Sequence, residues 1–74
     1  MTKRTFTSVV RREDDGYTAL CPELDVASQG STMDEAQANL REAVELLLET
    51  ASASEIERRL GGETCVTPLD VEIG

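Results

Sequence analysis

Histidine and tryptophan are absent from this chain of 74 residues, and its aromatic residues are one Phe and one Tyr. Without an imidazole, the chain cannot supply Ser–His or Cys–His catalysis or a histidine ligand to zinc. Cys21 and Cys65 fit neither a zinc-binding pattern nor a C-x-x-C redox motif. We therefore expect no catalytic residue, no metal site and no cofactor, and we expect both cysteines to be free thiols in a reducing compartment.

Long hydrophobic runs are also missing, and no apolar stretch is long enough to cross a bilayer or to form the core of a signal peptide. We expect a cytoplasmic protein without membrane association. A chain of this length fits one hydrophobic core, so the sequence predicts a single domain over residues 1–74. Because such a small core stabilises a fold only weakly, we expect a homodimer or a tetramer.

Basic residues are scarce: 7 Lys and Arg stand against 15 Asp and Glu, which gives a net charge of −8. Four of the basic residues, Lys3, Arg4, Arg11 and Arg12, lie in the first twelve positions, where no acidic residue occurs. Proteins that bind nucleic acids on their own usually present a basic surface. The composition therefore disfavours direct nucleic-acid binding and favours a basic protein as the partner.

Four segments have the composition of strands. Residues 5–12 and 17–21 flank Glu13–Gly16, an Asp-Gly turn in which we expect Gly16 to supply the positive φ of a hairpin. Residues 26–29 form a third short strand. After a loop over 63–68, apolar Leu69, Val71 and Ile73 alternate with acidic residues, which predicts a last, half-buried strand.

A long amphipathic helix is predicted over residues 33–50. Thr32 and Glu35 form a capping box at its start. Its apolar stripe includes Leu40, Val44 and Leu47, which we expect in the core. A second capping box, Ser54 with Glu57, predicts a short helix that runs to Leu60 and ends at Gly61-Gly62 with a left-handed glycine. The order β-β-β-α-(short α)-β indicates an α+β, two-layer fold with one long helix on one face of an antiparallel sheet.

The carboxylates allow two interpretations. A cluster of Asp and Glu can hold Mg²⁺ in a nuclease site, but no pair here has a diagnostic separation. Turns favour Asp for backbone reasons, so we interpret most of these carboxylates as solvated. Glu42, Glu45 and Glu49 lie opposite the apolar stripe of the long helix, where they would be solvent-exposed and could steer a cationic partner. The chemistry favours a binding module and not an enzyme.

A set of short motifs in residues 4–50 resembles the HicB-like antitoxin family. The motifs are Asp15-Gly16-Tyr17, Cys21-Pro22-Glu23-Leu24, Ser28-Gln29-Gly30, Thr32, Glu35-Ala36 and Ala43. The resemblance implies a partial RNase H-like fold without nuclease activity, assembly into dimers or tetramers, and a HicA-like partner, a small basic RNA-cleaving toxin that the antitoxin silences. The chain departs from the family at Asp25, Val26 and Ala27, where Pro, Gly and a small residue are usual, and it has one hairpin glycine where many relatives have two. We expect a short form without the C-terminal DNA-binding domain of many relatives.

The resemblance and the charge together suggest which residues contact partners. We expect Tyr17 and Leu24 to be apolar anchors for the toxin, and Leu46 and Leu48 to be available to a second copy. The full set expected at the toxin is Tyr17, Glu23, Leu24, Asp25, Glu42, Glu45 and Glu49; the set expected between copies is Leu46, Leu48, Val71 and Ile73. Two alternatives stay open: an orphan HicB-like oligomer with a scaffolding or small-ligand role, and a metal-dependent RNase H-like nuclease.

Overall fold

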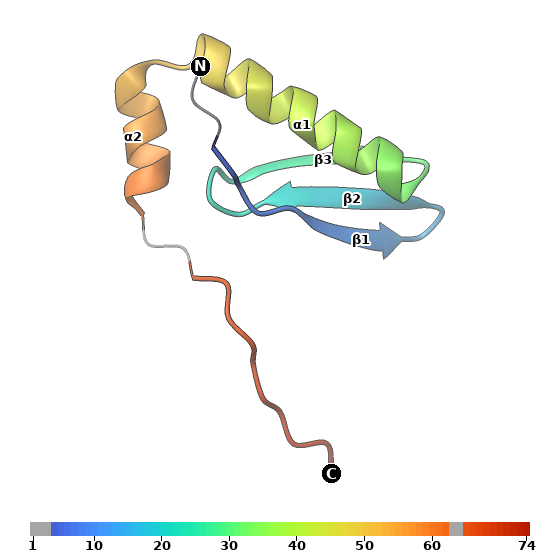
Figure 1. Ribbon diagram of the computed structural model, residues 1–74. Coiled ribbons are helices and arrows are strands. Elements are labelled where there is room, and N and C mark those ends of the chain that lie inside the picture. Colours follow the sequence, from blue (N-terminus) through green and yellow to red (C-terminus); the bar gives the residue numbers. More distant parts are fainter. Residues whose placement is uncertain (1–3, 63–64) are drawn as a thin grey trace.

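The computed structural model describes residues 4–62 and 65–74 and has the predicted α+β, two-layer architecture (Figure 1). Three antiparallel strands form one sheet in the order β1-β2-β3, and the long helix packs on one of its faces. The elements are β1 Val9–Glu13, β2 Gly16–Cys21, β3 Val26–Gly30, α1 Met33–Thr50 and α2 Ala53–Gly61. None of the helices in the described parts of the chain is long and apolar enough to cross a membrane.

The β1–β2 hairpin is tighter than the sequence predicts. Glu13 pairs with Gly16, so the turn consists of Asp14 and Asp15 alone. Asp14 adopts the positive φ, 50°, and Gly16 does not, which corrects the predicted role of the glycine. Asp tolerates this left-handed conformation better than most residues. The first strand also begins at Val9 and not at residue 5. Because β2 ends at Cys21, residues 5–7 lie beyond the end of the strand they would pair with, and the Ser8 side chain bonds to Gln37 of α1.

Helix α1 has the predicted start and length. The Thr32 hydroxyl accepts a hydrogen bond from the Glu35 N–H (3.0 Å), and the Glu35 carboxylate accepts one from the Ser31 N–H (2.9 Å). These bonds satisfy backbone donors that a helix start leaves free. Leu40 is buried as predicted, whereas Val44 and Leu47 are half-buried and pack against the edge of the core.

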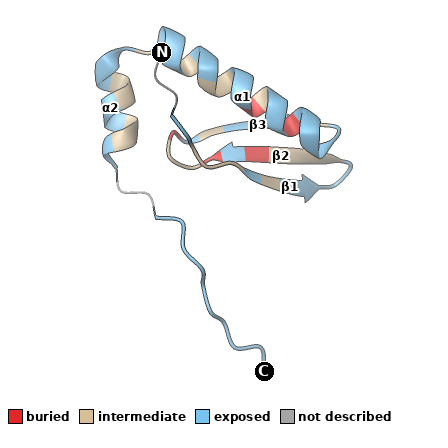
Figure 2. Cartoon of the chain, in the orientation of Figure 1, coloured by how far each residue is buried: buried red, intermediate tan, exposed pale blue. Residues whose placement is uncertain are grey.

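The core is made mostly of small side chains. Figure 2 shows the buried positions concentrated on β2 and on the sheet-facing side of α1. The buried residues are Ala19, Cys21, Leu24, Ala36 and Leu40. At Gly30, a Cβ atom would lie 2.6 Å from the Ala36 nitrogen, so α1 touches the sheet backbone directly at this point. Glycine is therefore required at residue 30 by the close approach of two backbones.

Helix α2 begins two residues earlier than predicted. Its N-cap is Ser52, whose hydroxyl accepts a hydrogen bond from the Glu55 N–H (3.2 Å), so the predicted pairing of Ser54 with Glu57 is wrong. Ser52 takes this place because α1 ends at Thr50, with Ala51 as its C-cap, and Ser52 already has an extended backbone. At the other end Gly62 has a φ of −72°, so the predicted left-handed glycine cap is also wrong.

The predicted last strand is not formed. Residues 65–74 have no regular secondary structure, and Leu69, Val71 and Ile73 are 85%, 69% and 98% exposed. Figure 1 shows this segment, which we call the C-terminal tail, extending away from the sheet and α1. A strand needs a neighbouring strand to satisfy its backbone, and within one copy the tail meets none. Of the loop predicted over 63–68, residues 63 and 64 lie outside the described residues.

The contact at Gly30 gives a test of the fold. Gly30→Ala should lower the free energy of unfolding by about 1–3 kcal/mol, because the new methyl group collides with the α1 backbone. Gly61→Ala is the matched control: a Cβ there meets nothing within 4 Å. At this helical position alanine should leave stability unchanged or raise it by up to about 1 kcal/mol. Urea denaturation of both variants measures the difference, and equal effects would contradict the close packing.

Candidate protein-interaction site

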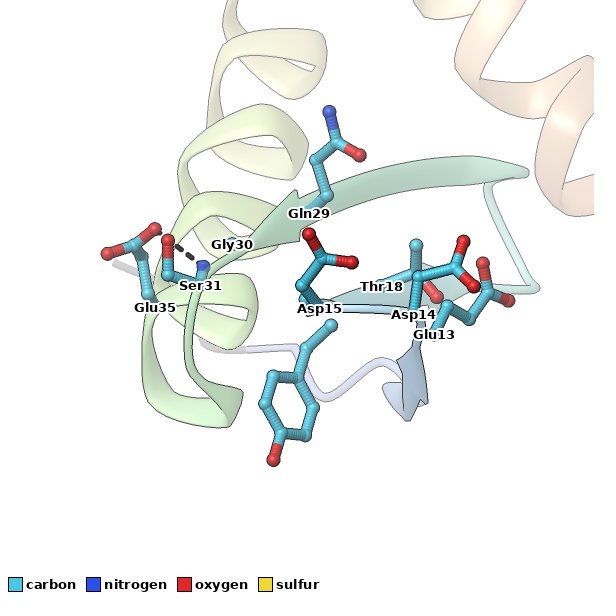
Figure 3. A pocket seen from close by; sticks show the side chains of 10 residues that line it. Glu13, Asp14, Asp15, Thr18, Gln29, Gly30, Ser31 and Glu35 are labelled. Carbon is cyan, nitrogen blue, oxygen red and sulfur yellow. Dashed lines mark hydrogen bonds between the residues drawn. The ribbon is translucent and has the colours of Figure 1, made fainter.

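The hairpin end of the sheet carries a concave acidic surface. Glu13, Asp14 and Asp15, from the β1–β2 hairpin, and Glu35, from the first turn of α1, line a hollow of about 520 Å³ that also contains Tyr17. We call this site the acidic hollow. Figure 3 shows Glu35 on one side of it and Glu13 and Asp14 on the other. The acidic hollow forms at this place because the pairing of Tyr17 with Gly30 brings the hairpin turn beside the start of α1.

The side chains of the acidic hollow are held unequally. Glu35 is fixed by its hydrogen bond from Ser31, drawn in Figure 3. Glu13 makes a long, exposed ion pair of 4.0 Å with Arg11. Tyr17 is half-buried, with part of its side chain packed against the core. A concave site that combines carboxylates with an aromatic ring suits an Arg or Lys side chain, which both groups attract.

A metal-ion site has less support. Among the residues that the structure describes, no group of three or more His, Cys, Asp or Glu side chains is placed to hold a metal ion. The carboxylates of the acidic hollow are spread around its rim and do not converge on one point (Figure 3). The arrangement therefore suits an extended cationic surface better than a single small cation.

The residues predicted to contact the toxin do not form one site. Tyr17 lies in the acidic hollow at the start of β2, whereas Asp25 lies in the turn that follows the other end of that strand. Glu42, Glu45 and Glu49 are all exposed on α1. We call these three residues the acidic helix face. The predicted set is thus divided between the acidic hollow, the acidic helix face and the β2–β3 turn.

Leu24 has a structural position, which corrects its predicted role as an anchor for the toxin, whereas Glu23 is half-buried and its contact with a partner stays a prediction. Leu24 is fully buried and is one of the two largest side chains in the core, so it is not available as an anchor. The Glu23 carboxylate accepts hydrogen bonds from the Thr7 hydroxyl (2.6 Å) and the Thr7 N–H (2.9 and 3.1 Å). These bonds, the one from the hydroxyl above all, hold the pKa of the Glu23 carboxyl below its ordinary value.

The same turn also binds α2. A guanidinium nitrogen of Arg59 donates to the Leu24 carbonyl oxygen (2.7 Å), and the other lies 3.3 Å from the Glu55 carboxylate. The Cys21 thiol donates weakly to Glu23 (3.7 Å), and burial raises the pKa of this thiol. Cys21 is therefore a packing residue, while Cys65 is exposed; both thiols are free.

The acidic hollow does not follow from local sequence patterns. Asp14 and Asp15 are predicted in a turn and Glu35 at a helix cap, and both predictions are correct locally. The sequence does indicate two consecutive antiparallel connections. When residues 17–21 pair with 26–30, the turn before residue 17 lies beside the helix that starts after residue 30. Combining the register with the charges would have found the site.

A second depression lies between residues 4–8 and α1. It has a volume of about 960 Å³, and its apolar lining comes from Phe6, Leu40, Val44 and Leu48. Glu42 and Glu45 of the acidic helix face also line it, together with Asp34. We call it the apolar groove. Arg4 lies over the Phe6 ring, 5.4 Å from its centroid, and Ser8 hydrogen-bonds to Gln37 of α1, so the N-terminal segment forms one wall of the groove.

Comparison with known proteins finds three UPF0150 relatives. Two UPF0150 proteins of Synechocystis sp. are 43% identical to this chain, one over 49 residues (64% of this chain and 68% of the relative) and one over 51 residues (66% and 74%). A UPF0150 protein of Helicobacter pylori is 31% identical over 67 residues, 89% of this chain and 93% of the relative. No family model matches the chain, and no solved structure does.

The hydrogen bonds of Glu23 predict a pH dependence of stability. A carboxyl whose pKa is lowered by folding stabilises the fold above its unfolded pKa, and this contribution is lost as the pH falls through the folded pKa. Glu23→Gln, which resembles the protonated side chain, should lower the Tm at pH 7. The difference from the parent chain should disappear as the pH falls below the ordinary carboxyl pKa of about 4.3.

Thermal unfolding between pH 7 and pH 3 measures this effect. Glu57→Gln is the control, since Glu57 is an exposed residue of α2. If the two variants differed from the parent in the same way at every pH, the link between Glu23 and Thr7 would not stabilise the fold.

Proposed function

The chain belongs to the UPF0150 family, and from this premise we propose that it is an antitoxin-like protein-binding module, without enzymatic activity, that binds a small basic RNA-cleaving toxin. The resemblance of residues 4–50 to the HicB-like antitoxins supports a HicA-like protein as the partner. In this proposal the protein acts in the cytoplasm, where the toxin would meet its RNA substrate.

The acidic hollow is the observation that carries the proposal. A toxin that binds RNA must be cationic where it contacts the phosphates. The hollow offers four carboxylates around Tyr17, and the chain has a net charge of −8. An Arg or Lys of the toxin that enters the hollow would contact these carboxylates in place of an RNA phosphate. The antitoxin and the RNA would then compete for the same surface of the toxin.

The acidic helix face has a different role in the proposal. Glu42, Glu45 and Glu49 are exposed and do not line the acidic hollow. Charges at the rim of an interface mainly accelerate the encounter of two proteins, while groups desolvated in the contact determine how slowly they separate. The helix face therefore steers the toxin, and the acidic hollow retains it.

Capture of the partner is the first experiment. The full chain, tagged and expressed in its native cell, should bring down a small basic protein. Addition of the purified chain should stop that protein from cleaving RNA in vitro. If no protein is captured, or if the captured protein cleaves RNA equally well with the chain present, the antitoxin function is wrong.

Two variants of equal charge separate the two acidic surfaces. The hollow variant is Glu13→Gln, Asp14→Asn and Asp15→Asn; the helix variant is Glu42→Gln, Glu45→Gln and Glu49→Gln. Asn is used at residue 14 because it tolerates the positive φ of 50° found there. The hollow variant should raise the dissociation rate about tenfold or more, equivalent to about 1.4 kcal/mol. The helix variant should mainly slow association, by about tenfold at low salt.

Binding kinetics at two salt concentrations measure both effects. The loss of association rate in the helix variant should shrink at about 1 M salt, where charges are screened beyond about 3 Å. Equal changes in the dissociation rate for both variants would mean that the acidic hollow has no special role.

A further inference from the structure

The C-terminal tail has the pattern of a strand but has no sheet to join in its own copy. Residues 69–73 alternate Leu69, Val71 and Ile73 with Asp70 and Glu72, and the three apolar side chains are 69–98% exposed. Exposed apolar side chains at this density mark an interaction surface. Because they recur every second residue, all three lie on one face of an extended strand. Such a strand buries them when it adds to the edge of a sheet whose core it then covers.

The two edges of the sheet are not equivalent. At the β3 edge, the Asn39 side-chain amide donates to the Gln29 carbonyl oxygen (2.8 Å), and α1 packs most closely on this strand. Because Gln29 directs its carbonyl away from β2, it belongs to a pair that exchanges no ladder hydrogen bonds with Thr18. The β3 edge is therefore partly occupied by the protein itself.

The alternation of hydrogen-bonded pairs between the strands shows which backbone groups are free at the β1 edge. Since Thr18 exchanges no backbone hydrogen bonds with Gln29 of β3, its N–H and C=O groups point toward Arg11, its partner in β1. The neighbouring residues Val10 and Arg12 then direct their N–H and C=O groups outward. No strand in the described parts of the chain pairs with this edge. A free edge of this kind is a template for another strand.

The side chains beside the β1 edge complement the tail on both faces. Val10 pairs with buried Ala19, so it lies on the α1 side of the sheet, where the apolar groove opens between residues 4–8 and α1. Arg11 lies on the opposite face, and its side chain is 78% exposed. A strand whose apolar residues face the groove presents Asp70 and Glu72 on the face that carries Arg11 and Glu13. Charges of opposite sign attract across strands and like charges repel, so the favoured register places the tail carboxylates beside Arg11.

The position of the tail indicates that the edge belongs to a second copy. Arg59 and Leu60 hold α2 against the β2–β3 turn and the core. From α2, the tail extends away from the chain's own β1 (Figure 1). In a dimer with a two-fold axis, the tail of each copy can pair with the β1 edge of the other. Both tails and both β1 edges are then paired.

We propose that residues 69–73 of one copy add as a fourth strand to the β1 edge of a second copy, with Leu69, Val71 and Ile73 over its apolar groove. The exchange forms a homodimer with two four-stranded sheets. It does not depend on the proposed toxin, so it is tested with the purified chain alone.

Proline scanning tests the strand. Val71→Pro removes a backbone donor from residues 69–73, and Val66→Pro makes the same change outside them at a position of similar exposure, 65% against 69%. Light scattering at micromolar concentration should give the mass of two chains for the parent and for Val66→Pro, and of one chain for Val71→Pro. Both sites are exposed in the monomer, so the far-ultraviolet circular dichroism should change little.

A spin label locates the contact. Cys65 is exposed and Cys21 is buried, so a thiol-reactive label attaches to the tail alone. Labelled chains are mixed with ¹⁵N-enriched Cys65→Ser chains, so that any broadening of amide signals arises between copies. Signals of β1 should lose more intensity than those of β3, which lies two strands farther from the added tail.

Four results would overturn the inference: a monomeric parent chain, equal dissociation by both proline variants, stronger broadening at β3 than at β1, or broadening only when label and isotope share one chain. The last result would mean that the tail returns to its own sheet. None of them bears on toxin capture, so a failure here is distinguishable from a failure of the proposed function.

Discussion

The β2–β3 turn is the contact on which the other parts of this fold depend. Its Leu24 side chain is completely buried, its Leu24 carbonyl binds Arg59 of α2, and its Glu23 carboxylate binds Thr7 of the N-terminal segment. Asp25 takes a positive φ of 55°, which allows the chain to turn back into β3. A four-residue connection thereby joins the core, the second helix and the N-terminal segment. Motifs that look like surface features in the sequence are here part of the packing.

The core supported by this turn is thin, and its thinness determines what the surface offers. Ala19, Ala36 and Gly30 let α1 approach the sheet closely, so few large side chains are needed between the layers. As a result, many larger apolar residues remain outside. Val9 and Leu20 are exposed on the face of the sheet opposite α1, and Leu46 and Leu48 are exposed on α1. A single copy therefore buries only a small part of the apolar area that its sequence contains, which makes association favourable.

Local patterns predict the elements of this fold well, and contacts between distant residues explain the errors. The capping box at Thr32 and the stripe through Leu40 depend on residues three or four apart, and both are found. Leu24 was wrongly predicted at a partner, and the bond of Glu23 with Thr7 was not predicted, because these contacts join residues that lie far apart in the sequence. The strand over residues 69–73 was predicted because apolar and acidic residues alternate there. This pattern indicates which side chains share a face, but it does not indicate which neighbouring strand would pair with the segment. The acidic hollow was missed for a similar reason, since it exists only after the hairpin register is set.

The acidic hollow and the apolar groove are separate surfaces of one copy. The acidic hollow lies at the hairpin end of the sheet, while the apolar groove lies between the N-terminal segment and α1, and no residue lines both. Arg11 lies on the face of β1 opposite α1, and its ion pair with Glu13, 4.0 Å long, is exposed. A strand added along β1 would bring Asp70 and Glu72 toward Arg11 and so leave Glu13 free to act in the hollow. Association of two copies would then present two acidic hollows on one particle, and a partner able to reach both would gain affinity without any new contact.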